Sequence, residues 1–124
     1  MSATPRSSLL LAGAALALAL CWPAPASAEG PTDKKLARLW KAKCSSCHGM
    51  DGKGDTEQGK KVSVGDMTRA DWQKARTDQQ MKDAILNGFK RETNGKKQEM
   101  EPFKDEVKPE QLEPLIAFVR SLAP

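Results

Sequence analysis

After the apolar N-terminal segment of the chain, the first pattern is a set of apolar side chains at helical spacing. Within Asp33–Lys43 the i, i+3, i+4 spacing places the apolar residues on one face of an amphipathic helix. Thr32 or Asp33 can cap its N-terminus, because both side chains accept hydrogen bonds from free backbone N–H groups. The apolar positions of this predicted helix are Leu36, Leu39 and Trp40.

A second helical stretch follows Thr77-x-x-Gln80, which has the sequence of a capping box. The stretch stops at Asn87-Gly88, a pair typical of a helix C-terminus. We therefore expect a helix between these two signals. Its apolar positions are Met81, Ile85 and Phe89.

The third helical stretch closes the chain. Pro109 is a favourable first helical residue, but Pro114 lacks the backbone N–H that a helix interior uses. We therefore expect the regular helix to begin only near Glu113. Its apolar positions are Leu112, Leu115, Ile116, Val119 and Leu122.

The segments between these helices are polar. Gly49–Gly65 and Lys90–Glu101 have little periodicity and are rich in glycine or charged residues, so both are predicted to be surface loops. Thr68–Arg76 is expected to form a short helix that carries Trp72. Because no alternating strand or hairpin pattern is evident, the sequence predicts an all-α fold.

The first 28 residues differ from the rest of the chain. Arg6 is their one charged residue, Leu9–Cys21 is an apolar run, and Ala26-Ser27-Ala28 follows a proline-containing break. The run is shorter than the ~20 residues that span a bilayer, and the arrangement is that of a cleavable secretory signal peptide. We expect residues 1–28 to be removed, leaving one exported domain over residues 29–124 without a membrane span. Lipidation of Cys21 is the alternative, although the preceding leucine is not the small residue usual there.

Composition narrows the chemistry of this domain. The 124-residue chain has a single histidine, which excludes sites that need two imidazoles, such as two-histidine zinc proteases and zinc fingers. Loss of residues 1–28 leaves Cys44 and Cys47 of the three cysteines and lowers the formal net charge from +4 to +3. This modest charge and the expected export disfavour nucleic-acid binding.

The candidate chemistry is concentrated in Cys44-Ser45-Ser46-Cys47-His48, because Cys-x-x-Cys-His is a sequence of c-type haem attachment. Two thiols three residues apart on the last turn of a helix face the same side, and each can add to one haem vinyl group. The histidine that follows then lies under the iron and supplies an axial nitrogen. A zinc site would need four ligands where this chain offers three, and a thioredoxin-like pair would need a βαβ context. The prediction is one covalent haem c, with a thiol–disulfide protein as a remote alternative.

Met100 is the candidate for the second axial ligand. It stands in a polar segment between two glutamates, where a methionine has no packing role, and a thioether suits low-spin iron. Met67 and Met81 lie in apolar patterns, and Met50 is too close to His48 to reach the opposite haem face. A lysine of the same polar segment is the competing ligand.

With these motifs the chain resembles the class I, mono-haem cytochromes c of the exported bacterial type, over Thr32–Pro124. The segments that carry the resemblance are Cys44–Gly49, Asp51-Gly52-Lys53-Gly54, Ile85-x-x-Gly88, Met100-x-Pro102-Phe103 and Leu115–Leu122. The resemblance implies a small cytochrome c fold of helices around one haem. It also implies that the N-terminal and C-terminal helices cross, with Trp40 and Phe118 near their contact.

The segment expected to support His48 departs from the family pattern. Val64-Gly65-Asp66 lacks the proline whose carbonyl often holds the proximal imidazole, but a backbone carbonyl of Val64 or Gly65 is an alternative acceptor that could fix the ring of His48 through its other nitrogen. The family also suggests that the indole N–H of Trp72 donates to a haem propionate. The alternative is that this indole finds some other acceptor.

The function implied by the resemblance is outer-sphere electron transfer by a periplasmic monomer with no enzyme reaction of its own. His48 and Met100 would fill both axial positions, and the methionine sulfur would raise the reduction potential. If Met100 does not ligate, the alternative is a five-coordinate haem that binds a gas or reacts with peroxide.

Redox partner proteins are expected to dock on a basic face of the protein. The alternative is that this face is simply solvated. Its residues are Lys90, Arg91, Lys96, Lys97 and Lys104.

Overall fold

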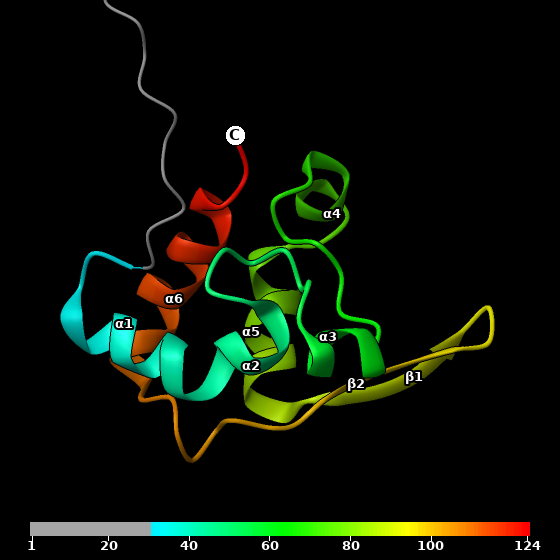
Figure 1. The fold of residues 1–124 in the computed structure, drawn as a ribbon. Coiled ribbons are helices and arrows are strands. Elements are labelled where there is room, and N and C mark those ends of the chain that lie inside the picture. Colours follow the sequence, from blue (N-terminus) through cyan, green and yellow to red (C-terminus); the bar gives the residue numbers. More distant parts are fainter. Residues whose placement is uncertain (1–30) are drawn as a thin grey trace, which may run out of the picture.

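The computed structural model describes residues 31–124, and Figure 1 shows how their elements are arranged. The predicted signal peptide, including Cys21, lies outside the described residues. In chain order the elements are α1 (Lys34–Leu39), the π-helical turn η1 (Trp40–Cys44), α2 (Ser45–His48), α3 (Glu57–Lys61), α4 (Ala70–Lys74), α5 (Asp78–Asn87), β1 (Phe89–Thr93), β2 (Lys96–Met100) and α6 (Pro109–Ser121). No helix in this part of the chain has the length and apolar character needed to cross a membrane.

The first three elements form one continuous helical segment from Lys34 to His48. Asp33 caps it, since its carboxylate accepts hydrogen bonds from the backbone N–H groups of Lys35 (2.7 Å) and Leu36 (2.9 Å). The segment ends at Gly49, whose φ of +77° is a conformation that glycine adopts at little cost. The predicted helix is therefore confirmed, and it extends beyond Lys43 to the histidine.

The prediction of an unbroken loop over Gly49–Gly65 is wrong, because α3 lies within it. Thr56 caps this helix by accepting a hydrogen bond from the N–H of Gly59 at 2.8 Å. The same hydroxyl oxygen lies 2.7 Å from the carbonyl oxygen of Ser46 and 3.1 Å from that of Cys47. One threonine therefore joins the start of α3 to the end of α2, a tertiary contact that the local sequence pattern does not reveal.

The prediction of a loop over Lys90–Glu101 is also wrong, and with it the prediction of an all-α fold. β1 and β2 form an antiparallel hairpin, which extends from the helices as an arm in Figure 1. Its two-residue turn is Asn94-Gly95, with positive φ at both residues (+53° and +73°), as a tight hairpin requires. Because both strands are mostly charged, they lack the polar and apolar alternation that normally identifies a half-buried strand.

Of the two helices that flank the hairpin, α5 follows its sequence signals and α6 departs from them. The capping box of Thr77 and Gln80 opens α5, and Gly88 closes it. The last helix, α6, begins at Pro109 rather than near Glu113, so that prediction is wrong. Pro114 is exposed, and the carbonyl left without its donor belongs to the exposed Glu110, which water can reach.

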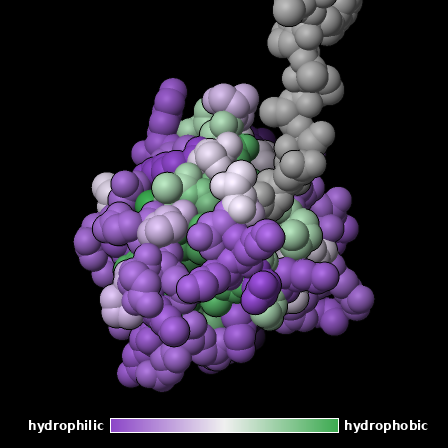
Figure 2. Space-filling view, turned by 90° about the vertical axis from the view of Figure 1, so that its left-hand side faces the viewer, coloured by the Kyte–Doolittle hydropathy of each residue, from purple (hydrophilic) through white to green (hydrophobic). Residues whose placement is uncertain are grey.

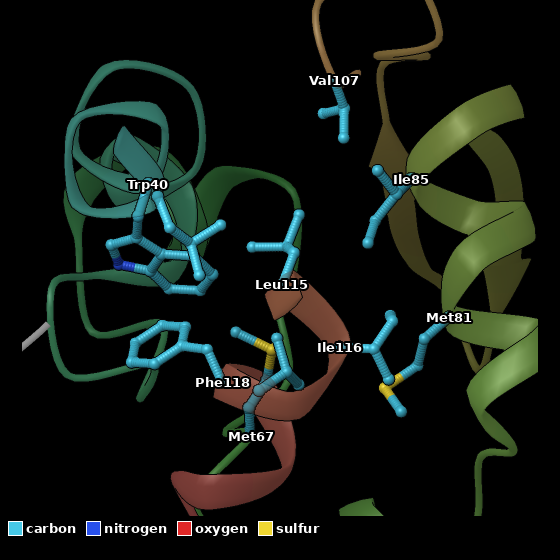
Figure 3. Close-up of a cluster of buried hydrophobic side chains, with 10 residues drawn as sticks. Trp40, Met67, Met81, Ile85, Val107, Leu115, Ile116 and Phe118 are labelled. Carbon is cyan, nitrogen blue, oxygen red and sulfur yellow. The ribbon is translucent and has the colours of Figure 1, made fainter. Parts of the chain in front are cut away.

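The core lies between the N-terminal helical segment, α5 and α6. Trp40 and Phe118 pack edge to face, with 4.8 Å between ring centroids, so the predicted contact between the first and last helices is confirmed. Leu115 and Ile116 continue the buried face of α6, and Ile116 points toward Met81 of α5 (Figure 3). On the α1 side of the molecule the surface is mainly hydrophilic (Figure 2), which leaves the apolar residues largely inside.

Arg120 of α6 ties down the link between α4 and α5. Its guanidinium donates to the carbonyl oxygens of Gln73 and Arg76, both at 2.6 Å, and to the carboxylate of Asp78 at 2.8 Å. Hydrogen bonds that satisfy otherwise free carbonyls at a helix end fix the chain there. The backbone of Arg76 is therefore held in one position.

Candidate functional site

A cavity of about 970 Å³ lies between the helices and the hairpin. All four site residues predicted from the sequence line it: Cys44, Cys47, His48 and Met100. Apolar side chains of the core form much of the remaining wall, so a bound group would complete the packing of this small domain. These apolar residues are Met67, Met81, Ile85, Leu115, Ile116 and Val119.

Cys44 and Cys47 are free thiols in the described structure, and both are half-buried. Burial and, to a smaller extent, the neighbouring Cys47 raise the pKa of the Cys44 thiol to about 11. Cys44 is therefore a neutral thiol at neutral pH, since removal from water disfavours the thiolate. A neutral S–H group is the form that adds across a carbon–carbon double bond with no change in charge.

His48 is half-buried at the end of α2, beside Trp40. Burial lowers the pKa of its imidazole to about 4, so the ring is neutral at physiological pH and keeps a lone pair for a metal. Its Nδ1 has no hydrogen-bond partner. The alternative bond to a carbonyl of Val64 or Gly65 is therefore absent in this structure.

The backbone around His48 is held by two contacts. Its carbonyl oxygen accepts a hydrogen bond from Gly54 N–H at 2.8 Å, and the indole N–H of Trp40 donates to the carbonyl of Gly49 at 3.1 Å. A β-carbon at Gly59 would collide with the carbonyl of Cys47, so α3 approaches this segment as closely as only glycine permits. These contacts fix the direction in which the attachment segment faces the cavity.

Met100 reaches the cavity from the last residue of β2 and packs partly buried against the core. In the hairpin it pairs with Phe89, the first residue of β1. Gly88 lies against the backbone of Met100, so a β-carbon at Gly88 would overlap the carbonyl oxygen of Met100. The end of α5 and the hairpin therefore set the position of this methionine together.

Residues that the sequence analysis did not assign form the cavity rim, most notably Arg76. Its guanidinium carbon lies 4.4 Å from the centre of the Trp72 ring, a cation–π contact. The indole nitrogen of Trp72 lies against Gly65, where a β-carbon would come within 2.7 Å of it. No sequence motif marks Arg76, and its role depends on the α4–α5 link that Arg120 fixes.

These observations fit a covalently attached haem. Two thiols and a neutral imidazole come from one helix end, and a thioether comes from a separate element that lines the same cavity. A broad apolar space next to soft and nitrogen ligands suits an iron porphyrin rather than a hydrated cation.

Comparisons with known proteins agree with this geometry. Residues 34–123 match the family model described as Cytochrome c. Among solved structures, the chain is similar to the KustC0563 c-type cytochrome, with 28% identity and a TM-score of 0.57. That similarity covers 70% of this chain and 95% of the other. The comparison with curated proteins finds no match.

Proposed function

Because this chain belongs to the cytochrome c family, whose members bind covalent haem c, we propose that it is an electron carrier with His48 and Met100 as the axial ligands of one haem. Members of the family typically carry electrons and are not enzymes. When bound, the haem supplies an iron that accepts and releases one electron. The observation that supports our ligand assignment is that the attachment segment and Met100, far apart in sequence, line one cavity.

The residues of the chain have distinct roles in this proposal. Cys44 and Cys47 would hold the cofactor covalently, each by a sulfur–carbon bond to a vinyl group, with the thiol proton going to the adjacent vinyl carbon. The neutral imidazole of His48 donates its lone pair, and the thioether of Met100 donates from the hairpin. With His48 and Met100 both holding the iron, its ligands would stay the same on oxidation and reduction, and the apolar part of the wall would limit water, so little rearrangement would accompany each transfer.

The proposal includes where the protein works. Residues 1–28 have the features of a cleavable signal peptide, so the mature domain, residues 29–124, is proposed to be a periplasmic monomer without a membrane span. Its N-terminal helical segment and α6 are proposed to cross as in the family, with Trp40 against Phe118. Acidic redox partner proteins are proposed to dock on the basic hairpin and the nearby Lys104.

The axial ligand is tested by replacing Met100→Ala in the haem-loaded protein. We expect loss of the low-spin spectrum and a lower reduction potential, because a sulfur ligand that favours ferrous iron is removed. Met50→Ala is the matched control, since Met50 is 45% exposed and lies outside the cavity. Absorption spectra of both redox states measure the spin state directly.

Two outcomes would contradict the ligand assignment. A Met100→Ala protein that stays low-spin would transfer the axial role to another side chain, such as a lysine of the hairpin. A wild-type protein that is already high-spin would indicate a five-coordinate haem open to gases or peroxide.

A further inference from the structure

One face of the β1–β2 hairpin is turned toward the cavity. Side chains alternate between the two faces of a strand, and the register pairs Phe89 with Met100 and Arg91 with Gln98. All four of these residues line the cavity. The inner face of the hairpin therefore presents an aromatic ring, a guanidinium, an amide and a thioether to whatever occupies the cavity.

Two arginines of the cavity wall have no carboxylate partner within residues 31–124. They are Arg91 of the hairpin and Arg76 of the α4–α5 link. The lining lysine, Lys43, is paired with Glu106 at 2.6 Å. Among the lining acids, Glu99 is paired with Lys90 on the outer face of the hairpin. The remaining acids are Asp83, which accepts a hydrogen bond from Gln79, and the exposed Glu101.

Each of the two guanidiniums lies over an aromatic ring and donates a hydrogen bond to an uncharged acceptor. Arg76 lies over Trp72 and donates to its carbonyl at 3.2 Å, while Arg91 lies 4.9 Å from the centre of the Phe89 ring. The Nε of Arg91 donates to the Gln98 side chain at 2.6 Å. Both terminal nitrogens of Arg91, and the Nε and Nη2 of Arg76, make no side-chain or backbone hydrogen bond in the described structure.

This arrangement is unfavourable for the polypeptide alone. Burial lowers the pKa of the Arg76 guanidinium, and repulsion from Arg91 lowers it further. Arginine stays protonated in proteins, so the repulsion between the half-buried Arg76 and the exposed Arg91 remains until an anion binds. A carboxylate that accepts from both guanidiniums would relieve that repulsion through charge-assisted hydrogen bonds.

We propose that Arg76 and Arg91 form a carboxylate-binding site for the two acid side chains of the haem, and that the hairpin closes this part of the cavity. The inference rests on the proposed function, since it places the haem in this cavity. Gln98 fixes the site, because its amide also donates to the carbonyl of Ser63 at 3.2 Å and so ties the hairpin to the segment after α3. The hairpin thereby contributes both an axial sulfur and a charge that compensates the carboxylates.

The test is the reduction potential of the haem-loaded protein between about pH 5 and 9. Arg91→Gln and Arg76→Gln are expected to lower the potential, because an uncompensated carboxylate stabilises ferric iron. They are also expected to make the potential depend on pH near neutrality, since a carboxylic acid that loses its cation titrates at higher pH. Arg91→Lys keeps the charge and is expected to restore most of the wild-type behaviour.

Lys97→Gln is the matched control. The substitution removes one positive charge from the same hairpin, but Lys97 pairs with Glu92 in the register and lies on the outer face. If both arginine variants match this control at every pH, the site does not bind the haem carboxylates. If the potential of the wild type instead changes with phosphate at constant ionic strength, and the variants lose that change, the site binds a free anion and the proposal is wrong.

A failure of the proposed function gives a different result. In that case the wild type itself carries no covalent haem on a denaturing gel or lacks methionine ligation in its spectrum. The arginine variants are compared only in protein that passes both measurements, so the two failures are distinguishable.

Discussion

At the scale of single residues, the structure depends on glycines where two backbones meet. Gly88 has a φ of +62° and leaves no room for a β-carbon against the carbonyl oxygen of Met100. Gly95, in the hairpin turn, has a similar φ of +73° but nothing within 4 Å of its would-be β-carbon. Substituting Gly95 therefore tests only the free-energy cost of a left-handed backbone, whereas substituting Gly88 adds the cost of a steric clash.

Gly88→Ala is expected to displace Met100, because both the strained φ and the overlap act on the chain just before the sulfur ligand. Gly95→Ala is expected to cost only roughly 1 kcal/mol of unfolding free energy, for the unfavourable φ, and to leave the spectrum unchanged. Chemical denaturation and the low-spin absorption spectrum measure the two effects. Equal spectra in the two variants would show that Gly88 does not position the methionine.

At the scale of elements, short sequence motifs correctly predicted the helix ends that local hydrogen bonds and backbone preferences determine. The cap at Asp33, the capping box at Thr77 and the stop at Gly88 are short-range hydrogen bonds and backbone preferences, and the structure has all three. The hairpin was missed although Asn94-Gly95 is itself a strong turn signal. Its inner face carries Arg91 and Gln98, which line a cavity instead of an apolar core, so the expected alternation is absent.

The contact of Thr56 between α2 and α3 leads to a prediction at the scale of elements. Thr56→Val removes the cap of α3 and the contacts to the Ser46 and Cys47 carbonyls, whereas Thr77→Val removes only the cap of α5. Loss of a cap costs about 1 kcal/mol, so both variants should be less stable, and Thr56→Val more so. Only Thr56→Val should alter the haem spectrum. Equal effects of the two variants on stability and spectrum would contradict a special role for this contact.

At the scale of the whole molecule, the cavity arises from segments that the sequence separates widely. The order of motifs indicated a haem protein, and the attachment segment indicated three of its contacts. The position of Arg76 could not be predicted, because it depends on hydrogen bonds from Arg120 in the last helix to the α4–α5 link. The missing carbonyl for His48 Nδ1 likewise depends on how closely two distant loops approach.

The distribution of charge over the whole molecule leads to a prediction about partners. Lys96 and Lys97 lie at the outer end of the hairpin, and Lys34 and Lys35 lie on α1 at the other side of the molecule (Figure 1). If acidic partners dock on the hairpin, replacing Lys96 and Lys97 by glutamate should slow electron transfer to an acidic redox protein about tenfold or more at low salt. The two rates should converge near 1 M salt, where the screening length is about 3 Å.

Replacing Lys34 and Lys35 by glutamate makes the same change in net charge and is the control for that experiment. Stopped-flow rates over a range of ionic strength decide between a local and a global effect, because charges on a docking surface act far more strongly than charges directed away from it. Equal slowing by both pairs would mean that net charge alone steers the encounter. Rates that do not change with ionic strength would contradict electrostatic docking, and the lysines of the hairpin would then be a solvated face.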